Sequence, residues 1–132
     1  AIGRLQMIPP TSRRAAASLG RPYTDDLLYD PEGNIQLGAW YIGRLLQKFK
    51  GQVALGAGSF NAGPAAMMRW LQRSGTRPLD EFVELCPYTQ TREYMKKLLD
   101  IYAHYVYLWD KEDYLPSLVV DKDYLAKDGI DY

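Results

Sequence analysis

The stretch that decides the fold is Ser59-Phe60-Asn61-Ala62-Gly63-Pro64, in which a polar amide stands beside residues that favour a tight turn. The segment before it, residues 53–60, is apolar and rich in small side chains, which predicts a short helix buried at the centre of the domain. Proline suits the first position of a helix, so a second helix is predicted from Pro64 to Gln72. The stretch Gly3-Arg4-Leu5-Gln6-Met7-Ile8-Pro9 places another amide at the edge of a helical segment.

The run Pro9-Pro10-Thr11 followed by residues 13–19 predicts the start of a helix that Gly20 ends. Helices are also predicted from Pro31 to just before Gly51, at 79–85, and at about 91–109. The helix from Pro31 carries apolar side chains at spacings of three or four that mark one face: Ile35, Ala39, Ile42, Leu46 and Phe49. Glycines at 38 and 43 within it suggest that another helix packs closely there. No alternation of apolar and polar residues is long enough to demand a sheet, so the fold class is predicted to be mostly α.

The helix at 91–109 has an apolar face and an opposite polar face, and the polar one carries the chain's single histidine, His104. The apolar face comprises Tyr94, Leu98, Ile101, Tyr105 and Leu108, and the polar face comprises Glu93, Lys97, Asp100 and His104. We therefore predict that His104 is a surface residue and neither a base nor a metal ligand. Residues 109–132 are predicted to be an irregular tail or the start of a following segment.

Composition excludes several classes of function. The chain has 132 residues, enough for one domain, and its 16 Lys and Arg balance its 16 Asp and Glu, which gives no general attraction to nucleic acid. A lone cysteine, Cys86, lies in an apolar setting and is predicted to be a small buried hydrophobe. One His and one Cys cannot build a zinc site, and no glycine-rich phosphate loop or membrane-spanning run is found, so no metal and no cofactor are expected.

The remaining candidate chemistry is a set of amides and aromatic rings that suits sugars. Gln6, Asn61 and Gln90 offer donors and acceptors for hydroxyl and acetamido groups. Rings for stacking are offered by Trp40, Trp70, Tyr88 and Tyr94. Composition alone favours a simpler interpretation, in which Asn61 caps the helix beginning at Pro64 and Gln6 satisfies a backbone group.

The order of four motifs changes this weighting, because together they resemble the catalytic domain of soluble lytic transglycosylases, which share the goose-type lysozyme architecture. Residues 3–11 resemble the family's Gly-Leu-Met-Gln-aliphatic-Met-Pro-x-Thr segment, and residues 28–38 its Leu-x-x-Pro-x-x-Asn-Ile-x-x-Gly block. Residues 60–64 resemble its Tyr-Asn-Ala-Gly-Pro turn, and residues 84–94 its Glu-x-Ile-Pro-aromatic-x-Glu-Thr-Arg-x-Tyr block. The match runs from residue 1 to about 108, which we predict to be a lytic transglycosylase-like domain without its N-terminal part.

The resemblance implies cleavage of the β-1,4 bond between N-acetylmuramic acid and N-acetylglucosamine in peptidoglycan, with formation of a 1,6-anhydro ring. The family uses one glutamate as acid and then base, and that glutamate precedes the Gly-Leu-Met-Gln segment. It would therefore lie upstream of Ala1, and the chain, which opens within a motif and lacks an initiator Met, is expected to be a fragment without its proton donor. Glu84 fits the family's structural acid and is expected to orient other groups.

Four departures from the family pattern leave a second hypothesis open. Phe60 replaces a tyrosine, Gln90 a glutamate and Leu5 a methionine, while Arg4 stands at a usually apolar position where burial would be costly. These changes fit a non-catalytic peptidoglycan-binding module of the same fold. A helical assembly domain and a hydrolase that uses water, as goose-type lysozymes do, are further alternatives.

The resemblance also implies where the substrate binds and where the parent protein acts. Glycan strands of peptidoglycan are the expected partner, and the periplasm or the bacterial cell envelope is the expected location. The predicted substrate-binding residues are Gln6, Ile8, Phe60, Asn61, Tyr88, Gln90 and Tyr94, with Arg92 and Tyr94 expected to brace the wall of the cleft.

Overall fold

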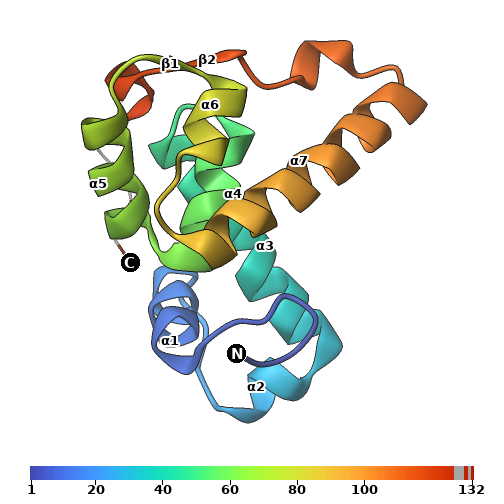
Figure 1. Cartoon of the computed structure of the whole chain (residues 1–132). Helices are drawn as coiled ribbons and strands as arrows, with labels where there is room; N and C mark the ends of the chain where they lie inside the picture. Colours follow the sequence, from blue (N-terminus) through green and yellow to red (C-terminus); the bar gives the residue numbers. More distant parts are fainter. Residues whose placement is uncertain (127–129, 131) are drawn as a thin grey trace. The chain divides into compact units, whose positions relative to one another are not determined.

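Seven α-helices account for most of the described residues in the computed structural model, which covers residues 1–126, 130 and 132 (Figure 1). The mostly α fold class is therefore confirmed. The chain divides into an N-terminal unit, Ala1–Arg44, and a C-terminal unit, Leu45–Tyr132, and each is considered by itself. Among the described residues, no helix combines the length and the apolar character that crossing a membrane requires.

The N-terminal unit holds α1 (Pro9–Ser18), α2 (Asp26–Tyr29) and most of α3 (Pro31–Lys48). Proline occupies the first turn of α1, where its missing N–H is tolerated. Ahead of α1, a tight loop is closed by backbone hydrogen bonds in both directions between Ile2 and Met7, at 2.8 and 3.0 Å. The predicted helix start at Pro9-Pro10-Thr11 is confirmed, and the helix ends at Ser18, shortly before Gly20.

Asn34 on α3 fixes that loop from inside the unit. Its Oδ1 accepts from the Leu5 backbone N–H at 2.9 Å, and its Nδ2 donates to the carbonyls of Ile2 at 2.9 Å and Leu28 at 3.2 Å. Gly3 has a φ of +74°, and a β-carbon there would overlap the Asn34 amide, so both the turn and the close approach require glycine. A buried polar side chain thus determines the path of the first residues.

The predicted face of α3 is wrong in its first half. Ile35 is 44% exposed and Ala39 is exposed, whereas Asn34, Leu37 and Tyr41 are buried. The helix is rotated because Asn34 satisfies the N-terminal loop, and a count of apolar residues misses such a polar anchor. Close packing at Gly38 is confirmed, but the neighbour is Leu5 of that loop rather than a helix. At Gly43 the prediction is wrong, because a β-carbon there would meet nothing within 4 Å.

The C-terminal unit is built around α4 (Val53–Ala62), whose residues 54–59 are all buried, as predicted. It packs against α5 (Pro64–Ser74) and α7 (Thr89–Leu108), and α6 (Leu79–Glu84) packs against α7. Gly63 has a φ of +89° and serves as both the C-cap of α4 and the N-cap of α5, so the two helices share a single joining residue. Pro64 occupies the first turn of α5, as predicted.

The buried set at the core of this unit draws on every helix and on the tail. It comprises Phe49, Ala54, Leu55, Met67, Trp70, Leu71, Leu79, Phe82, Val83, Cys86, Met95 and Val120. Trp70 is therefore a core residue, and the prediction that its ring is available for stacking on a ligand is wrong. Cys86 is fully buried, as predicted, and burial raises the pKa of its thiol.

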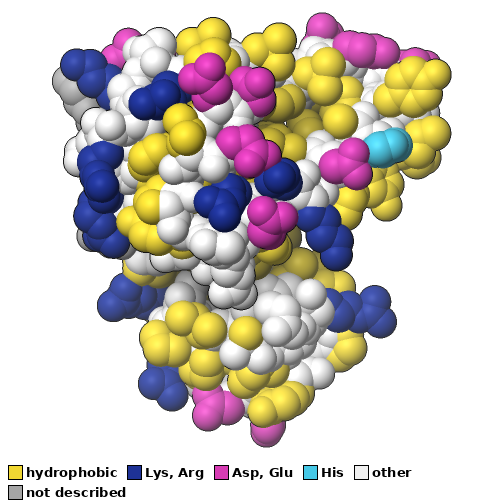
Figure 2. Space-filling model, viewed as in Figure 1, with side chains coloured by type: hydrophobic (Ala, Val, Ile, Leu, Met, Phe, Trp, Pro, Cys, Tyr) yellow, Lys and Arg dark blue, Asp and Glu magenta, His cyan; other side chains and the backbone are white. Residues whose placement is uncertain are grey.

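The apolar face predicted for α7 holds only near its start. Tyr94 and Leu98 are half-buried, but Ile101, Tyr105 and Leu108 are exposed, and the buried residues are Thr91, Met95 and Val106. The C-terminal half of α7 extends beyond the other helices of its unit (Figure 1), so little protein surface remains there to cover its apolar side chains. His104 is exposed, as predicted, and is visible at the surface in Figure 2.

The segment after α7 also belongs to the C-terminal unit and contains two 3₁₀ turns, Glu112–Tyr114 and Lys122–Tyr124. Between them β2 (Val119–Val120) pairs antiparallel with β1 (Arg77–Pro78), a short strand pair that sequence alternation did not reveal. Val120 is buried in the core, and the Gln52 side chain donates to the Ser117 carbonyl at 3.2 Å. The described part of the tail is therefore packed on this unit, while the domain boundary at residue 108 stays a prediction.

Candidate functional site

Two of the predicted substrate-binding residues, Gln6 and Ile8, lie in the N-terminal unit. Gln6 is exposed, has a φ of +48°, and its Nε2 donates to the Gly3 carbonyl at 2.8 Å, so it does satisfy a backbone group. Ile8 is 48% exposed at the N-cap of α1. Asn34 holds the loop that carries both residues, so it orients them without belonging to the predicted set.

Asn61 is exposed near the end of α4, and its side chain contacts α7. The Thr91 hydroxyl donates to Asn61 Oδ1 at 2.8 Å, and Thr91 is only 3% exposed. The alternative in which Asn61 caps the next helix is wrong, because the N-cap of α5 is Gly63 and makes no side-chain capping bond. Sequence reasoning did not single out Thr91, although it lies within the motif at residues 84–94.

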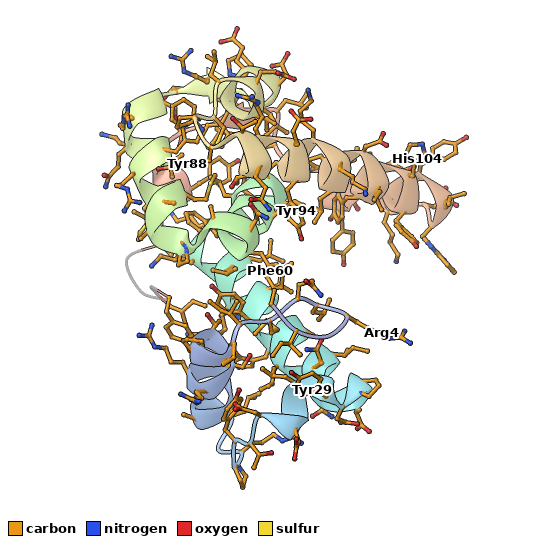
Figure 3. The ribbon with its side chains drawn as sticks, turned by 60° about the horizontal axis from the view of Figure 1, so that its bottom comes forward. Arg4, Tyr29, Phe60, Tyr88, Tyr94 and His104 are labelled. Atoms are coloured by element: carbon orange, nitrogen blue, oxygen red, sulfur yellow. The ribbon has the colours of Figure 1, made fainter. Side chains whose placement is uncertain are left out.

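The remaining predicted residues surround the start of α7. Gln90 is exposed and Tyr94 half-buried, and their spacing of four residues places them on one helix face. Burial raises the pKa of the Tyr94 phenol further above neutrality. Phe60 on α4 and Tyr94 on α7 are labelled in Figure 3, and Tyr88, at the N-cap of α7, packs partly against the core.

Charged side chains near the start of α7 make contacts with the residues that precede this helix. Arg92 donates to the Cys86 carbonyl at 3.1 Å, which ties α7 to the turn before it. Glu84 pairs with Lys96 at 2.7 Å, and this hydrogen bond and the carboxylate charge raise the pKa of the Lys96 amine. Arg4 is exposed and points away from the loop (Figure 3), so the cost expected of a buried arginine does not arise.

The glutamates of the chain are not in surroundings that suit a general acid. All five glutamates, Glu32, Glu81, Glu84, Glu93 and Glu112, are exposed. A glutamate that stays protonated near neutral pH needs an apolar, water-poor pocket. Within the same residues, no group of three His, Cys, Asp or Glu side chains is placed to hold a metal ion.

A groove of about 640 Å³ in the C-terminal unit lies away from the predicted residues. It runs between α6, α7 and the tail, with Leu79, Val83, Leu99 and Leu118 among its walls and Lys96 beside it. None of Phe60, Asn61, Tyr88, Gln90 and Tyr94 lines it.

Ser59 is fully buried beside the candidate residues, and its hydroxyl has no hydrogen-bond partner in the described structure. Because an unsatisfied buried hydroxyl is unfavourable, Ser59→Ala is expected to raise the free energy of unfolding by about 1 kcal/mol in urea titrations followed by tryptophan fluorescence. Ser74→Ala is the matched control, since the buried Ser74 hydroxyl donates to the Leu71 carbonyl at 3.2 Å, and its loss should be destabilising. If both variants lose the same free energy of unfolding, the Ser59 hydroxyl is not unsatisfied.

Residues 1–83 match the transglycosylase SLT domain family, and the chain belongs to this family. The resemblance inferred from the four motifs is thereby confirmed.

Particular relatives agree in sequence and in structure. Over 121 residues the chain is 32% identical to the soluble lytic murein transglycosylase of Escherichia coli K12, a match that covers 89% of this chain and 19% of that protein. The crystal structure of the 70 kDa soluble lytic transglycosylase from Escherichia coli superposes with a TM-score of 0.76 at 31% identity, over 85% of this chain and 19% of that one.

A second solved structure, an inactive mutant of the lytic transglycosylase Slt from Pseudomonas aeruginosa in which a glutamate is replaced by glutamine, gives a TM-score of 0.73 at 27% identity. That match covers 96% of this chain and 20% of the other. The lytic transglycosylase fold is therefore confirmed, and the chain spans about a fifth of the length of the relatives that it matches.

Proposed function

We propose that this chain is part of a peptidoglycan lytic transglycosylase, which cleaves the β-1,4 bond between N-acetylmuramic acid and N-acetylglucosamine and leaves a 1,6-anhydro ring. The observation that carries this proposal is membership of the SLT family together with retention of the Gln6 loop and the Asn61 turn. The names of the relatives, soluble lytic murein transglycosylases, support the same reaction.

The substrate is proposed to be the glycan strand of peptidoglycan, in the periplasm or elsewhere in the bacterial cell envelope. Amide side chains would hydrogen-bond hydroxyl and acetamido groups, while Ile8 and the aromatic rings would pack on sugar faces. The residues proposed to contact the glycan are Gln6, Ile8, Phe60, Asn61, Tyr88, Gln90 and Tyr94.

The proton donor is proposed to be a glutamate that precedes Ala1 in the full-length protein. Two observations support this: every glutamate of the chain is exposed, and a glutamate-to-glutamine exchange is present in the inactive Pseudomonas aeruginosa mutant. A group on the surface cannot keep its proton near neutral pH as well as one in an apolar pocket.

The proposed chemistry needs one carboxyl group and no water. The glutamic acid gives its proton to the glycosidic oxygen, the bond from that oxygen to C1 of the muramic acid breaks, and the N-acetylglucosamine leaves with a free 4-hydroxyl. The resulting carboxylate then takes the proton of the muramic acid 6-hydroxyl, whose oxygen bonds to C1. The second carboxylate of most glycosidases is thereby replaced by a hydroxyl of the substrate itself.

The test uses the full-length protein on purified peptidoglycan, with mass spectrometry of the products. Anhydro-muropeptides, one water lighter than hydrolysis products, are expected. Replacing the upstream glutamate with glutamine should slow their formation by about 10²- to 10⁴-fold, the usual contribution of a general acid. Glu112→Gln is the matched control, because Glu112 is exposed on a 3₁₀ turn and should leave the rate unchanged.

A non-catalytic glycan-binding module is the second candidate, favoured by Phe60 and Gln90 at positions where the family pattern has a tyrosine and a glutamate. It predicts saturable binding of glycan strands with no cleavage by the full-length protein. Products that have gained a water would instead identify a hydrolase, and anhydro products from the glutamine variant at the full rate would reject the single-acid scheme.

A further inference from the structure

The hydrogen bond from Thr91 to Asn61 joins the two helices that present the candidate residues of the C-terminal unit. Thr91 lies in the first turn of α7 and is 3% exposed, so its hydroxyl has little access to water. Asn61 is exposed at the end of α4, and its Oδ1 accepts the hydroxyl proton at 2.8 Å. The bond therefore links a buried donor to an amide that faces solvent.

We propose that Thr91 is a positioning residue that sets which end of the Asn61 carboxamide faces the ligand. This inference rests on the proposed binding of peptidoglycan glycans. A carboxamide can turn its oxygen and its amino group end for end, and only its hydrogen bonds decide between the two orientations. With Oδ1 held by Thr91, the Nδ2 amino group is left to donate, and no residue of the described structure accepts from it.

The burial of Thr91 suits this task. A threonine hydroxyl can also accept a hydrogen bond, but if the carboxamide turned so that Nδ2 donated to it, the proton of this buried hydroxyl would lose the acceptor that Asn61 Oδ1 provides. Because water has little access to the hydroxyl, the orientation in which Oδ1 accepts is favoured. An exposed serine or threonine would exchange partners with solvent and leave the carboxamide free to turn.

An amino group fixed in this way selects a ligand that presents an acceptor. The carbonyl oxygen of an N-acetyl group is such an acceptor, whereas the ammonium group of a de-N-acetylated sugar offers only donors. The Thr91–Asn61 pair would thus make binding depend on N-acetylation of the hexosamine. Gln90 and Tyr94 lie on the neighbouring face of α7, where they can contact the same sugar.

The experiment measures binding of two hexasaccharides by the full-length protein in calorimetric titrations: fully N-acetylated chitohexaose and its fully de-N-acetylated counterpart. Wild-type protein should prefer chitohexaose. Thr91→Val keeps the shape of the side chain and removes the hydroxyl. It should weaken chitohexaose binding by about tenfold and reduce the ratio of the affinity for chitohexaose to that for the de-N-acetylated ligand. Thr91→Ser should restore both the affinity and the ratio.

Two further variants separate positioning from general destabilisation. Asn61→Asp keeps an acceptor for Thr91 but loses the amino group, so it should stay as stable as wild type and lose chitohexaose affinity by at least about tenfold. Val106→Ala removes a buried side chain far along α7 and should destabilise without changing the ligand ratio.

The outcomes distinguish this inference from the proposed function. If wild type binds chitohexaose and Thr91→Val leaves the ratio of affinities unchanged, the role of Thr91 is refuted and the glycan function stands. If wild type binds neither hexasaccharide, glycan binding by this chain is refuted, and the role of Thr91 with it.

Discussion

Asn34→Ala is expected to lower the free energy of unfolding by about 2 to 4 kcal/mol, because it strips three backbone groups of their partner at once. Asn34 is fully buried, so neither the Leu5 N–H nor the Leu28 carbonyl gains an equivalent bond to water. The loop that carries Gln6 and Ile8 would lose its anchor, and its amide protons should exchange faster with deuterium.

The measurement is urea unfolding followed by circular dichroism, combined with hydrogen exchange over residues 1–8. Gln36→Ala is the matched control, because Gln36 is exposed on the same helix and its loss should cost less than about 0.5 kcal/mol. If the two variants are equally stable, or if the exchange at residues 1–8 is unchanged, Asn34 does not anchor the loop.

Phe82→Ala is expected to cost about 3 to 5 kcal/mol, the usual range for removal of a buried phenylalanine ring. Phe82 is fully buried, its ring centroid lies 5.6 Å from that of Trp70, and its carbonyl accepts from the Trp70 indole at 3.1 Å. The cavity would reach the Trp70 ring, so tryptophan emission should shift to longer wavelength as water enters.

Phe82→Leu provides the comparison, since a smaller change of buried volume should cost less than about 2 kcal/mol. Leu85→Ala, at an exposed position just after the same helix, should be close to neutral. Urea midpoints and emission spectra of the three variants test this order, and a Phe82→Ala protein as stable as Phe82→Leu would show that the core closes over the missing ring.

Local chemistry explains which helices could be predicted from the sequence. The small apolar segment at 53–60 left no polar face for solvent, and it forms the buried centre of its unit. The predictions that Pro64 begins a helix and that the polar face with His104 is exposed are also confirmed, because each depends only on the chemistry of the residues concerned.

Features that depend on distant partners could not be predicted in this way. Asn34 is a polar residue and would be expected at the surface. Only its three hydrogen bonds to backbone groups distant in the sequence explain its burial and the rotation of α3. Ile101 and Tyr105 have helical apolar spacing, but no other helix of the unit extends far enough to cover them.

The candidate site shows the same division. Asn61 and Tyr94 were found from motifs, whereas Thr91 was missed because nothing in its own chemistry says that its hydroxyl meets an amide thirty residues away. The one indication in the sequence is that Thr91 lies within the motif at residues 84–94.

Gly63 has a consequence for how this family can vary. Since one residue ends α4 and begins α5, adding a residue at that joint would change the direction in which α5 leaves α4 and displace α5 relative to the core. Trp70 and Met67 would then leave the core. Changes of chain length during evolution are therefore expected to be excluded from this junction and to accumulate in outer segments such as residues 20–25.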